Sequence, residues 1–380
     1  MSLFLLTFFL LYGGLHFYFF LKVRAAFAPG AAAQAILITL LVLGLMAPII
    51  VRVAERAGLP MLVRVVAWAG YVWMAVVLLF FSAGLILDLW RLLVHTSGLV
   101  FRWDVAGYLP TARTLFFVPL AMALVISGYG FFEARQIRTE RVVIRSAKLP
   151  KTMEKLRIVQ ISDVHIGVLV RGERLAEMLR RVREASPDLV VATGDLVDGQ
   201  LDSMAEAAAQ LREIRPRFGK FAVTGNHEFY AGLDEAVEFI RQSGFTLLRQ
   251  EMTAVAGAFD LAGVDDPTIR RYGPRGGLSD REVLSGAAGR GGRFAILLKH
   301  QPYVEKDAPG AFDLMLSGHT HKGQIFPFSL VTRRFFHYHS GNYRLANDAL
   351  LHVSRGTGTW GPPIRFLAPP EITVIDLIPG

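Results

Sequence analysis

The sequence predicts an α/β domain, built on a largely parallel β-sheet with a second sheet packed on it, that follows a region of four membrane helices. Three patterns indicate this fold class: long apolar runs without charges, alternating strand-like and helix-like segments, and a later stretch dense in strands. A chain of 380 residues exceeds the usual size of a single domain, so two units are expected.

Four long apolar runs occupy the first third of the chain. Residues 2–21, 32–51, 65–87 and 114–132 contain no Asp, Glu, Lys or Arg. Because about 20 apolar residues span a bilayer, each run is predicted to be a transmembrane helix. The first run lacks a basic start and a small-residue cleavage site, so we interpret it as a retained anchor rather than a signal peptide. Residues 1–133 are therefore expected to form the transmembrane region.

Basic residues predict the orientation of this region. An even number of spans places both ends of the region on one side of the membrane. On that side would lie the 52–64 loop and the segment after the fourth span, whose basic residues are Arg52, Arg56, Arg64, Arg135, Arg138, Arg141, Arg145 and Lys148. Loops rich in Lys and Arg usually lie on the cytoplasmic side of the membrane. The chain is therefore expected to be an integral protein of the cell (inner) membrane with its soluble part in the cytoplasm.

The remainder of the chain reads as a basic linker, residues 134–152, and a soluble domain, residues 153–380. The linker can add an edge strand. Strands alternating with helices favour a parallel sheet, and the later strands would form the second sheet. The expected strands are 156–161, 188–193, 220–224, 258–264, 294–299, 311–317, 349–354 and 371–377; the expected helices are 172–185, 202–214 and 233–242; and residues 273–277 and 286–292 are expected loops.

Charge and cysteine content exclude some classes of protein. The formal net charge is +9, yet the basic residues are interspersed and form no block typical of a nucleic-acid arm. We therefore expect no nucleic-acid partner, whereas a basic face near the membrane would suit anionic lipid headgroups. The chain has no cysteine, which excludes disulfides and thiolate metal sites.

Polar side chains follow the strand-like runs, at the point where each strand ends. In open α/β sheets the loops at this carboxyl edge converge. Carboxylate, amide and imidazole donors suit a pair of divalent metals roughly 3.5–4 Å apart that share one carboxylate, and Asp195 is expected to be the bridge. Mn²⁺ or Fe suits this mixed set best, and Zn²⁺ also fits. The donors lie in Asp163-Val164-His165, Gly194-Asp195 with Asp198, Gly225-Asn226-His227-Glu228, His300 and Gly318-His319-Thr320-His321.

These five blocks, in this order, resemble the calcineurin-like metallophosphoesterases over roughly residues 155–325. The segments 353–360 and 369–372 further resemble a bacterial, membrane-anchored branch of that family. The resemblance implies a four-layer αββα sandwich. It also implies two ligand sets: Asp163, His165, Asp195 and His321 for one metal, and Asp195, Asn226, His300 and His319 for the other.

The expected reaction is hydrolysis of a phosphodiester or pyrophosphate bond by a metal-bridging hydroxide. His227 adjoins a ligand without being needed as one, so it is the candidate catalytic residue that protonates the leaving oxygen or stabilises charge on the phosphoryl group. Asp198 and Glu228 are expected to accept hydrogen bonds that orient the histidines.

Apolar and cationic residues follow the last metal block. One interpretation packs them beneath the second sheet, and the other makes them a lip that touches the bilayer, with Trp360 as the opposing wall. The second interpretation, with the membrane anchor, suggests a lipid-linked substrate such as a phospholipid. The resemblance to the metallophosphoesterases further implies a UDP-diacylglucosamine-type molecule as a candidate, because some members of that family cleave the pyrophosphate bond of such a lipid. The lip residues are Phe326, Phe328, Arg333, Arg334, Phe335 and Phe336.

Two alternatives stay open. The enzyme can act on soluble nucleotides or phosphoproteins, with the anchor serving only to localise it. The chain can also be a non-enzymatic scaffold or transporter with a regulatory metal domain. A transport path needs ionisable residues within the membrane, and the four runs contain only His16, which argues against a transporter.

Overall fold

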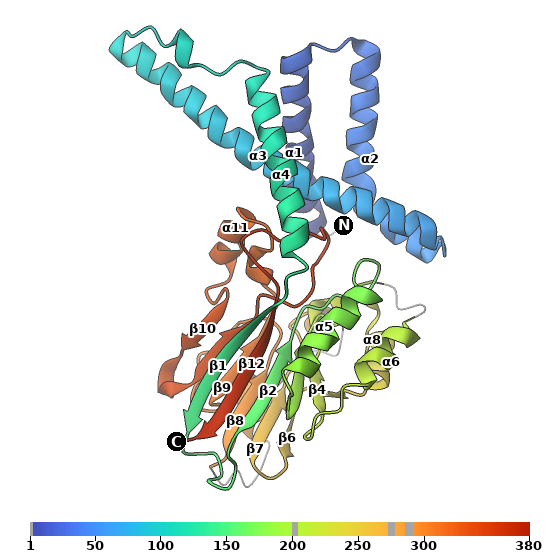
Figure 1. Ribbon diagram of the computed structural model, residues 1–380, viewed down its shortest axis with the longest axis vertical. Coiled ribbons are helices and arrows are strands. Elements are labelled where there is room, and N and C mark those ends of the chain that lie inside the picture. The colour runs from blue at the N-terminus through green and yellow to red at the C-terminus, as the bar shows by residue number, and fades with distance from the viewer. Residues whose placement is uncertain (1–2, 200–203, 273–277, 286–291) are drawn as a thin grey trace. The chain divides into compact units, whose positions relative to one another are not determined.

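The computed structural model describes residues 3–199, 204–272, 278–285 and 292–380. The chain forms two compact units (Figure 1). Unit 1 contains residues 1–132 and the short segment Gly361–Phe366, and unit 2 contains Glu133–Trp360 and Leu367–Gly380.

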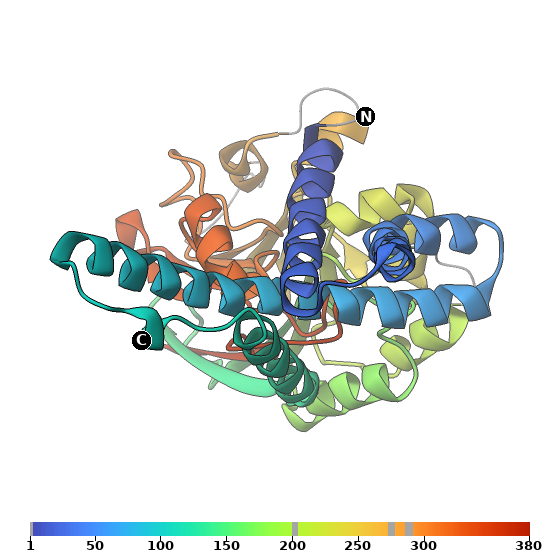
Figure 2. The same ribbon diagram turned by 90° about the horizontal axis from the view of Figure 1, so that it is seen from above.

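Unit 1 consists of long apolar helices. Four of its helices are long and apolar enough to cross a membrane. The third has 42 residues and is visible in Figure 2 as the longest helix of this unit. The elements are α1 (Leu3–Phe27), α2 (Ala31–Arg56), α3 (Pro60–Phe101), the short 3-10 helix η1 (Ala106–Tyr108) and α4 (Thr114–Glu133).

Helix α3 extends well beyond the apolar run 65–87 that predicts it. The charged residue Asp88 ends the apolar run but not the helix. Its carboxylate accepts hydrogen bonds from the Tyr18 hydroxyl, at 2.7 Å, and from Lys22 Nζ of α1. The helix ends where Arg102 adopts a left-handed backbone conformation and its N–H bonds to the carbonyl of Gly98.

Segment Gly361–Phe366 packs within unit 1 although it lies near the end of the chain. The backbone N–H of Arg365 donates to the carbonyl of Gly130 in α4 at 3.0 Å. The ring of Phe366 meets that of Tyr129 at a centroid distance of 6.1 Å. The chain therefore leaves unit 2 after Trp360, contacts the end of α4, and returns to unit 2 for its last strand.

Unit 2 is built on two six-stranded sheets (Figure 1). In the first, only the β12–β2 pair is antiparallel. Its order is β1 (Arg138–Ser146), β12 (Glu371–Pro379), β2 (Leu156–Ile161), β3 (Leu189–Thr193), β4 (Lys220–Val223) and β5 (Thr246–Leu247). The second sheet has the order β10 (Gly341–Arg344), β11 (Leu350–Val353), β9 (Leu314–Ser317), β8 (Phe294–Leu298), β7 (Phe259–Gly263) and β6 (Glu251–Val255).

Apolar side chains on both faces of each sheet create the layers. One buried cluster joins the first sheet to α5, α6 and α8, and another fills the space between the sheets. A third lies on the outer face of the second sheet and includes Val283 and Leu284 of α10. The predicted four-layer αββα fold is confirmed. The helices of unit 2 are α5 (Glu173–Glu184), α6 (Ala205–Arg212), α7 (Asn226–Ala231), α8 (Leu233–Gln242), α9 (Ile269–Tyr272), α10 (Asp280–Ser285) and α11 (Phe328–Phe335), with the 3-10 helices η2 (His321–Gly323) and η3 (Ala346–Asp348).

Strands buried on both faces were the easiest to predict. Strand β3, with the sequence LVVAT, is buried at every position, as the apolar run indicates. The segment 134–152 contributes β1, which pairs in parallel with β12 at the sheet edge. The expected loops 273–277 and 286–291, and the start of the expected helix 202–214, lie outside the described residues.

Candidate metal centre

The five polar blocks lie together at the carboxyl edges of the two sheets. Asp163 and His165 follow β2, and Asp195 follows β3. Asn226 begins α7 directly after β4. In the second sheet His300 follows β8, whereas His319 and His321 follow β9. Because β2, β3 and β4 run parallel, as do β8 and β9, these loops leave their sheets at the same end.

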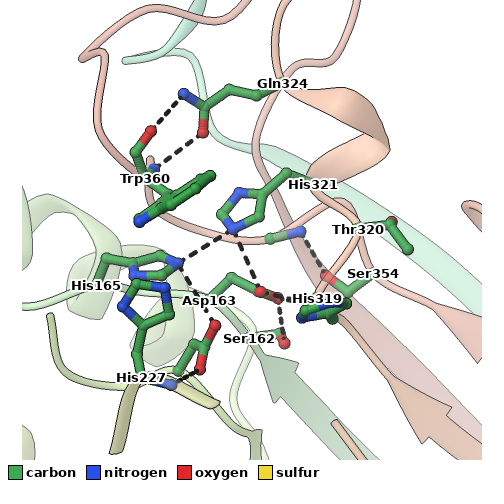
Figure 3. A network of polar contacts seen from close by, with 12 residues as sticks. Ser162, Asp163, His165, His227, His319, Thr320, His321, Gln324, Ser354 and Trp360 are labelled. Atoms are coloured by element: carbon green, nitrogen blue, oxygen red, sulfur yellow. Dashed lines mark hydrogen bonds and ion pairs between the residues drawn. The ribbon is translucent and has the colours of Figure 1, made fainter. Parts of the chain in front are cut away.

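Asp163, His165 and His321 form one possible metal-binding group (Figure 3). Their donor atoms lie within 4.8 Å of one another, and all three residues are buried. His321 Nε2 lies 3.3 Å from Asp163 Oδ1 and 3.1 Å from His165 Nε2. The first and last blocks, more than 150 positions apart, therefore face each other as expected.

Asp195, His300 and His319 form another such group. Asp195 Oδ2 lies 3.1 Å from His300 Nε2, which in turn lies 3.1 Å from His319 Nδ1. The carboxamide oxygen of Asn226 is 3.2 Å from the same His300 nitrogen. Asp195 also belongs to a further group with His165 and His227, so its carboxylate lies between the two halves of the site.

The chemistry of these donors fits divalent metals. Two imidazole nitrogens that face each other at 3.1 Å can share at most one proton, and this arrangement occurs twice. Within the described part of the chain, the buried Nδ1 atom of His165 has no hydrogen-bond partner. Buried carboxylate, amide and imidazole donors converging in this way suit two cations with mixed oxygen and nitrogen ligands.

Several of these residues have a strained backbone. Asp163, His165, Asp195, His319 and His321 all have positive φ angles, between 48° and 71°. This left-handed region is unfavourable for residues other than glycine and costs on the order of 1–3 kcal/mol at each position. Hydrogen bonds between loops hold it in place: the N–H of Asp163 donates to Gly194 O and that of His165 to Asp195 O, both at 3.1 Å.

Two glycines allow this close approach. A Cβ atom on Gly318 would collide with Ser162 Oγ and Asp163 Oδ2. A Cβ atom on Gly225 would collide with the Asp195 carboxylate. These two positions therefore have space only for glycine. The sequence pattern alone indicated both glycines only as turn residues.

Glu228 has a role that differs from the expected one. Its carboxylate accepts hydrogen bonds from the backbone N–H groups of Asp195, Leu196 and Gly225, at 3.0, 2.8 and 2.6 Å. It therefore ties the loop after β3 to that after β4, rather than orienting a histidine ring. Burial, and then the charge of Asp195, raise the pKa of Glu228 to about 7.

His227 lies beside the donors and is oriented by Asp198. Its Nδ1 is 2.9 Å from Asp198 Oδ1, as expected for Asp198, and its backbone N–H donates to Asp195 Oδ1 at 2.8 Å. Burial opposes the charged form, but the Asp195 charge and the hydrogen bond to Asp198 outweigh it and raise the pKa of His227 to about 9. In the metal-free protein this imidazole is therefore protonated at neutral pH and can donate a proton.

Burial acts to lower the pKa of three other histidines of the metal-free site as well, and nearby charges decide the net direction. Burial, followed by the charge of His227, lowers the pKa of His165 to about 3. Burial, and then His300, lower the pKa of His319 to about 4. For His300 burial also disfavours the charge, but Asp195 prevails and its pKa is raised. Neutral imidazoles are the form that binds metals, so His165 and His319 are ready to do so.

Two half-exposed aromatic side chains flank His227. The His227 ring lies 5.5 Å from that of Tyr230 and 5.7 Å from that of Trp360. Trp360 is held by Gln324, whose carboxamide bonds to both its backbone N–H and its carbonyl at 2.9 Å (Figure 3). Trp360 therefore lies beside His227 at the centre. Gln324 and Tyr230 were missed, because no spacing pattern marks them.

The expected lip residues are exposed and not packed beneath the second sheet. Phe326, Phe328, Arg333, Arg334 and Phe335 are exposed, and the interpretation that buried them is wrong. Phe336 differs from the others: it is half-buried, and its ring lies 5.1 Å from that of His319.

Comparisons with known proteins agree with this geometry. A family model described as calcineurin-like phosphoesterase matches residues 156–323. The chain is 39% identical over 258 residues to an uncharacterized metallophosphoesterase of Aquifex aeolicus, an alignment covering 67% of this chain and 97% of that protein. It is 31% identical to an uncharacterized metallophosphoesterase of Helicobacter pylori (strain J99), covering 74% of this chain and 76% of that protein.

A further relative is named as a transmembrane protein. The chain is 35% identical over 271 residues to a Danio rerio protein named "Transmembrane protein with metallophosphoesterase domain". That alignment covers 68% of this chain and 61% of the relative, so the chain spans less than two thirds of it. The similarity to nearly all of the Aquifex protein, together with the two groups of Asp and His donors, establishes that this chain belongs to the calcineurin-like metallophosphoesterases, which use divalent metals.

Proposed function

We propose that this chain is a membrane-anchored phosphoesterase with two divalent metals that hydrolyses a phosphodiester or pyrophosphate bond in a lipid-linked substrate. Membership of the family supports metal-dependent hydrolysis of a phosphoester. The observation that carries the proposal is the convergence of two donor groups on the shared Asp195 carboxylate.

The proposed ligands divide between two metals, with Mn²⁺ as the first candidate. Bound there, the two cations would polarise the phosphoryl group and lower the pKa of a water molecule for attack on phosphorus. One metal would be held by Asp163, His165, Asp195 and His321, and the other by Asp195, Asn226, His300 and His319.

His227 is the proposed proton donor. Its hydrogen bond to Asp198 orients the ring. A protonated imidazole beside the donors can stabilise charge on the phosphoryl group and pass a proton to the leaving oxygen. The half-exposed Trp360 and Tyr230 beside it would contact the group that leaves.

The membrane helices support a lipid-linked substrate. Four candidate spans would keep the enzyme at a surface where amphiphilic phosphoesters are concentrated. A phospholipid or a UDP-diacylglucosamine-type molecule has a phosphoester or pyrophosphate bond at the membrane surface. We further propose that residues 1–133 form the anchor, that residues 134–152 link it to the catalytic domain 153–380 and add the edge strand β1 to its first sheet, and that this domain faces the cytoplasm from the inner membrane.

An activity panel tests the proposal. The full chain in detergent, loaded with Mn²⁺, is assayed on bis(p-nitrophenyl) phosphate, phospholipids, a UDP-linked diacyl sugar, nucleotides and a phosphopeptide. Hydrolysis of the lipid substrates in preference to the soluble ones is expected. Hydrolysis of nucleotides or phosphopeptide alone would refute the lipid-linked substrate while leaving the reaction class intact.

The substitution Asp195→Asn tests the metal centre itself. It keeps the side-chain shape and removes the charge that both donor groups share, so activity on every substrate should be abolished. The matched control is Asp234→Asn on the exposed surface of α8, which should leave activity unchanged. Full activity of Asp195→Asn would rule out the proposed centre.

A further inference from the structure

Helix α11 presents its apolar side chains outward. The exposed fractions are 43% for Phe328, 58% for Leu330, 45% for Val331 and 77% for Phe335. An amphipathic helix of a soluble protein turns such residues toward the core. This helix has no buried residue at all, although half of its residues are apolar. An exposed apolar surface of this kind marks an interaction site.

The inward face of α11 is made of small polar residues. Ser329 and Thr332 lie against Gly323, at a point where no side chain would fit. The Thr332 hydroxyl is 2.6 Å from His339 Nε2, a contact that fixes the rotation of the helix. Because these contacts use the polar side, the apolar side of α11 is exposed by the way the helix packs and not by fraying of the chain.

The charges on α11 indicate which partner fits. Arg333 and Arg334 lie in the last turn, are exposed, and adjoin the exposed Phe335. Exposed phenylalanines beside arginines suit the boundary between acyl chains and phosphate headgroups, where rings enter the apolar layer and guanidinium groups bind phosphates. The candidate membrane spans in the same chain would hold unit 2 near such a surface.

The helix is also connected to the metal-binding loop. Phe336, directly after α11, meets His319 at a centroid distance of 5.1 Å. The Thr320 hydroxyl donates to the carbonyl of His339 at 2.6 Å, and the side chain of His339 contacts Thr332 of the helix. A lipid bound at α11 would therefore lie beside the loop that carries two of the proposed ligands.

We propose that the outward face of α11, formed by Phe328, Leu330, Val331, Arg333, Arg334 and Phe335, docks into the anionic headgroup layer of the bilayer. This docking rests on the membrane anchoring in the proposed function but not on its substrate. It would place the metal centre at the membrane surface and give lipid phosphoesters a short path to it.

The absence of cysteine makes a direct test feasible, because a single introduced cysteine is the only one that a dye can label. The full chain carrying Phe335→Cys or Val331→Cys is labelled with an environment-sensitive fluorophore. It is then reconstituted into phosphatidylcholine vesicles with and without phosphatidylglycerol. The matched control is Ala256→Cys, in the exposed turn before β7, at the sheet edge opposite His300.

The expected result is a blue-shifted emission of the Phe335 and Val331 labels, with quenching by spin-labelled lipids and no quenching of the Ala256 label. Quenching should be stronger with phosphatidylglycerol, and Arg333→Gln with Arg334→Gln should remove that difference. Labels on α11 that are quenched no more than the Ala256 label would overturn the docking. If the labelled protein that retains Arg333 and Arg334 is quenched equally with and without phosphatidylglycerol, the proposed contact between the arginines and the headgroups would be overturned. Neither quenching result depends on metal or substrate. A failure of the docking can therefore be distinguished from a failure of the proposed function.

Discussion

Asp195 connects several loops of the metal centre. Its Oδ1 accepts the backbone N–H of His227 at 2.8 Å, and its Oδ2 faces His300 at 3.1 Å. Its own N–H donates to Glu228, and its carbonyl accepts the N–H of His165. The spacing of the blocks predicted the carboxylate as a shared donor. The backbone hydrogen bonds could not be predicted, because they depend on how the loops approach one another.

At Gly318 the site leaves no space for a methyl group. In Gly318→Ala the new Cβ would push against Ser162 and the Asp163 carboxylate. Metal affinity should fall by about 10–100-fold, since displaced ligand geometry has effects of this size. Isothermal titration with Mn²⁺ measures the change. Gly107→Ala, where a Cβ meets no atom within 4 Å, is the control, and equal affinities of the two variants would contradict the crowding argument.

Glu228 offers a test of the backbone contacts. In Glu228→Gln an NH₂ group replaces one acceptor oxygen and faces backbone N–H donors that then lack a partner. A buried unsatisfied donor costs about 1–3 kcal/mol, so the free energy of unfolding should fall by roughly that amount. Denaturant unfolding of the metal-free protein in detergent measures it. The exposed Glu238→Gln on α8 should change nothing, and an unchanged Glu228→Gln would show that the loops hold together without this carboxylate.

At the scale of elements, long buried strands and the helices between them could be predicted from apolar runs. Shorter elements could not be. Strand β5 has two residues, and β10 alternates half-buried with exposed positions, so neither has a strong apolar pattern. Helix α11 was also missed, because it has only eight residues and so offers a short periodic pattern, and the side to which its apolar residues turn depends on packing.

Strand β4 begins with a buried lysine that connects two helices. Lys220 Nζ donates to the carbonyls of Leu211 and Ser243, at 2.6 and 2.7 Å, near the ends of α6 and α8. Burial, then the charges of Arg212 and Arg215, lower its pKa from 10.5 to about 8. Between these pH values the unfolded chain binds more protons than the folded one, so stability should rise with pH in this window.

The substitution Lys220→Met should abolish the contribution of this lysine to the rise of stability with pH. The free energy of unfolding of the wild type, relative to this variant, should increase from pH 8 to pH 10.5. Denaturant titrations at several pH values measure the difference. The exposed Lys306→Met should retain the wild-type slope, and a parallel pH dependence of wild type and Lys220→Met would show that Lys220 keeps its ordinary pKa.

At the scale of the molecule, the proposed ligands come from both sheets of unit 2. Asp163, Asp195 and Asn226 follow strands of the first sheet, whereas His300 and His321 follow strands of the second. Metals bound between them would therefore link the two sheets. A cation that binds only the folded state stabilises it by about 2.7 kcal/mol at a concentration 100 times its Kd.

Removal of metal should therefore lower both activity and stability. Chelation is expected to abolish hydrolysis and to lower the midpoint of thermal unfolding of the full chain, and Mn²⁺ should restore both. Differential scanning fluorimetry over a Mn²⁺ titration measures the shift. Asp195→Asn is the comparison: a shift as large as that of the wild type would mean that the metal binds elsewhere.

Membrane topology is a further whole-molecule prediction. Because the chain lacks cysteine, single cysteines report the side of the membrane. Ala256→Cys in unit 2 should resist an impermeant maleimide in intact cells and react after permeabilisation. Gly107→Cys, between α3 and α4, should react from outside. Labelling of the Ala256 variant in intact cells would place the catalytic domain on the outer side instead.

The donor set, the apolar helices and the alternating α/β pattern could be predicted from the amino-acid sequence, because residue type and spacing along the chain carry that information directly. The contacts of Glu228 with backbone N–H groups, the contact of Gln324 with Trp360 and the outward face of α11 were evident only in the folded chain. These features depend on which loops and faces meet in space, and local pattern does not record those distances.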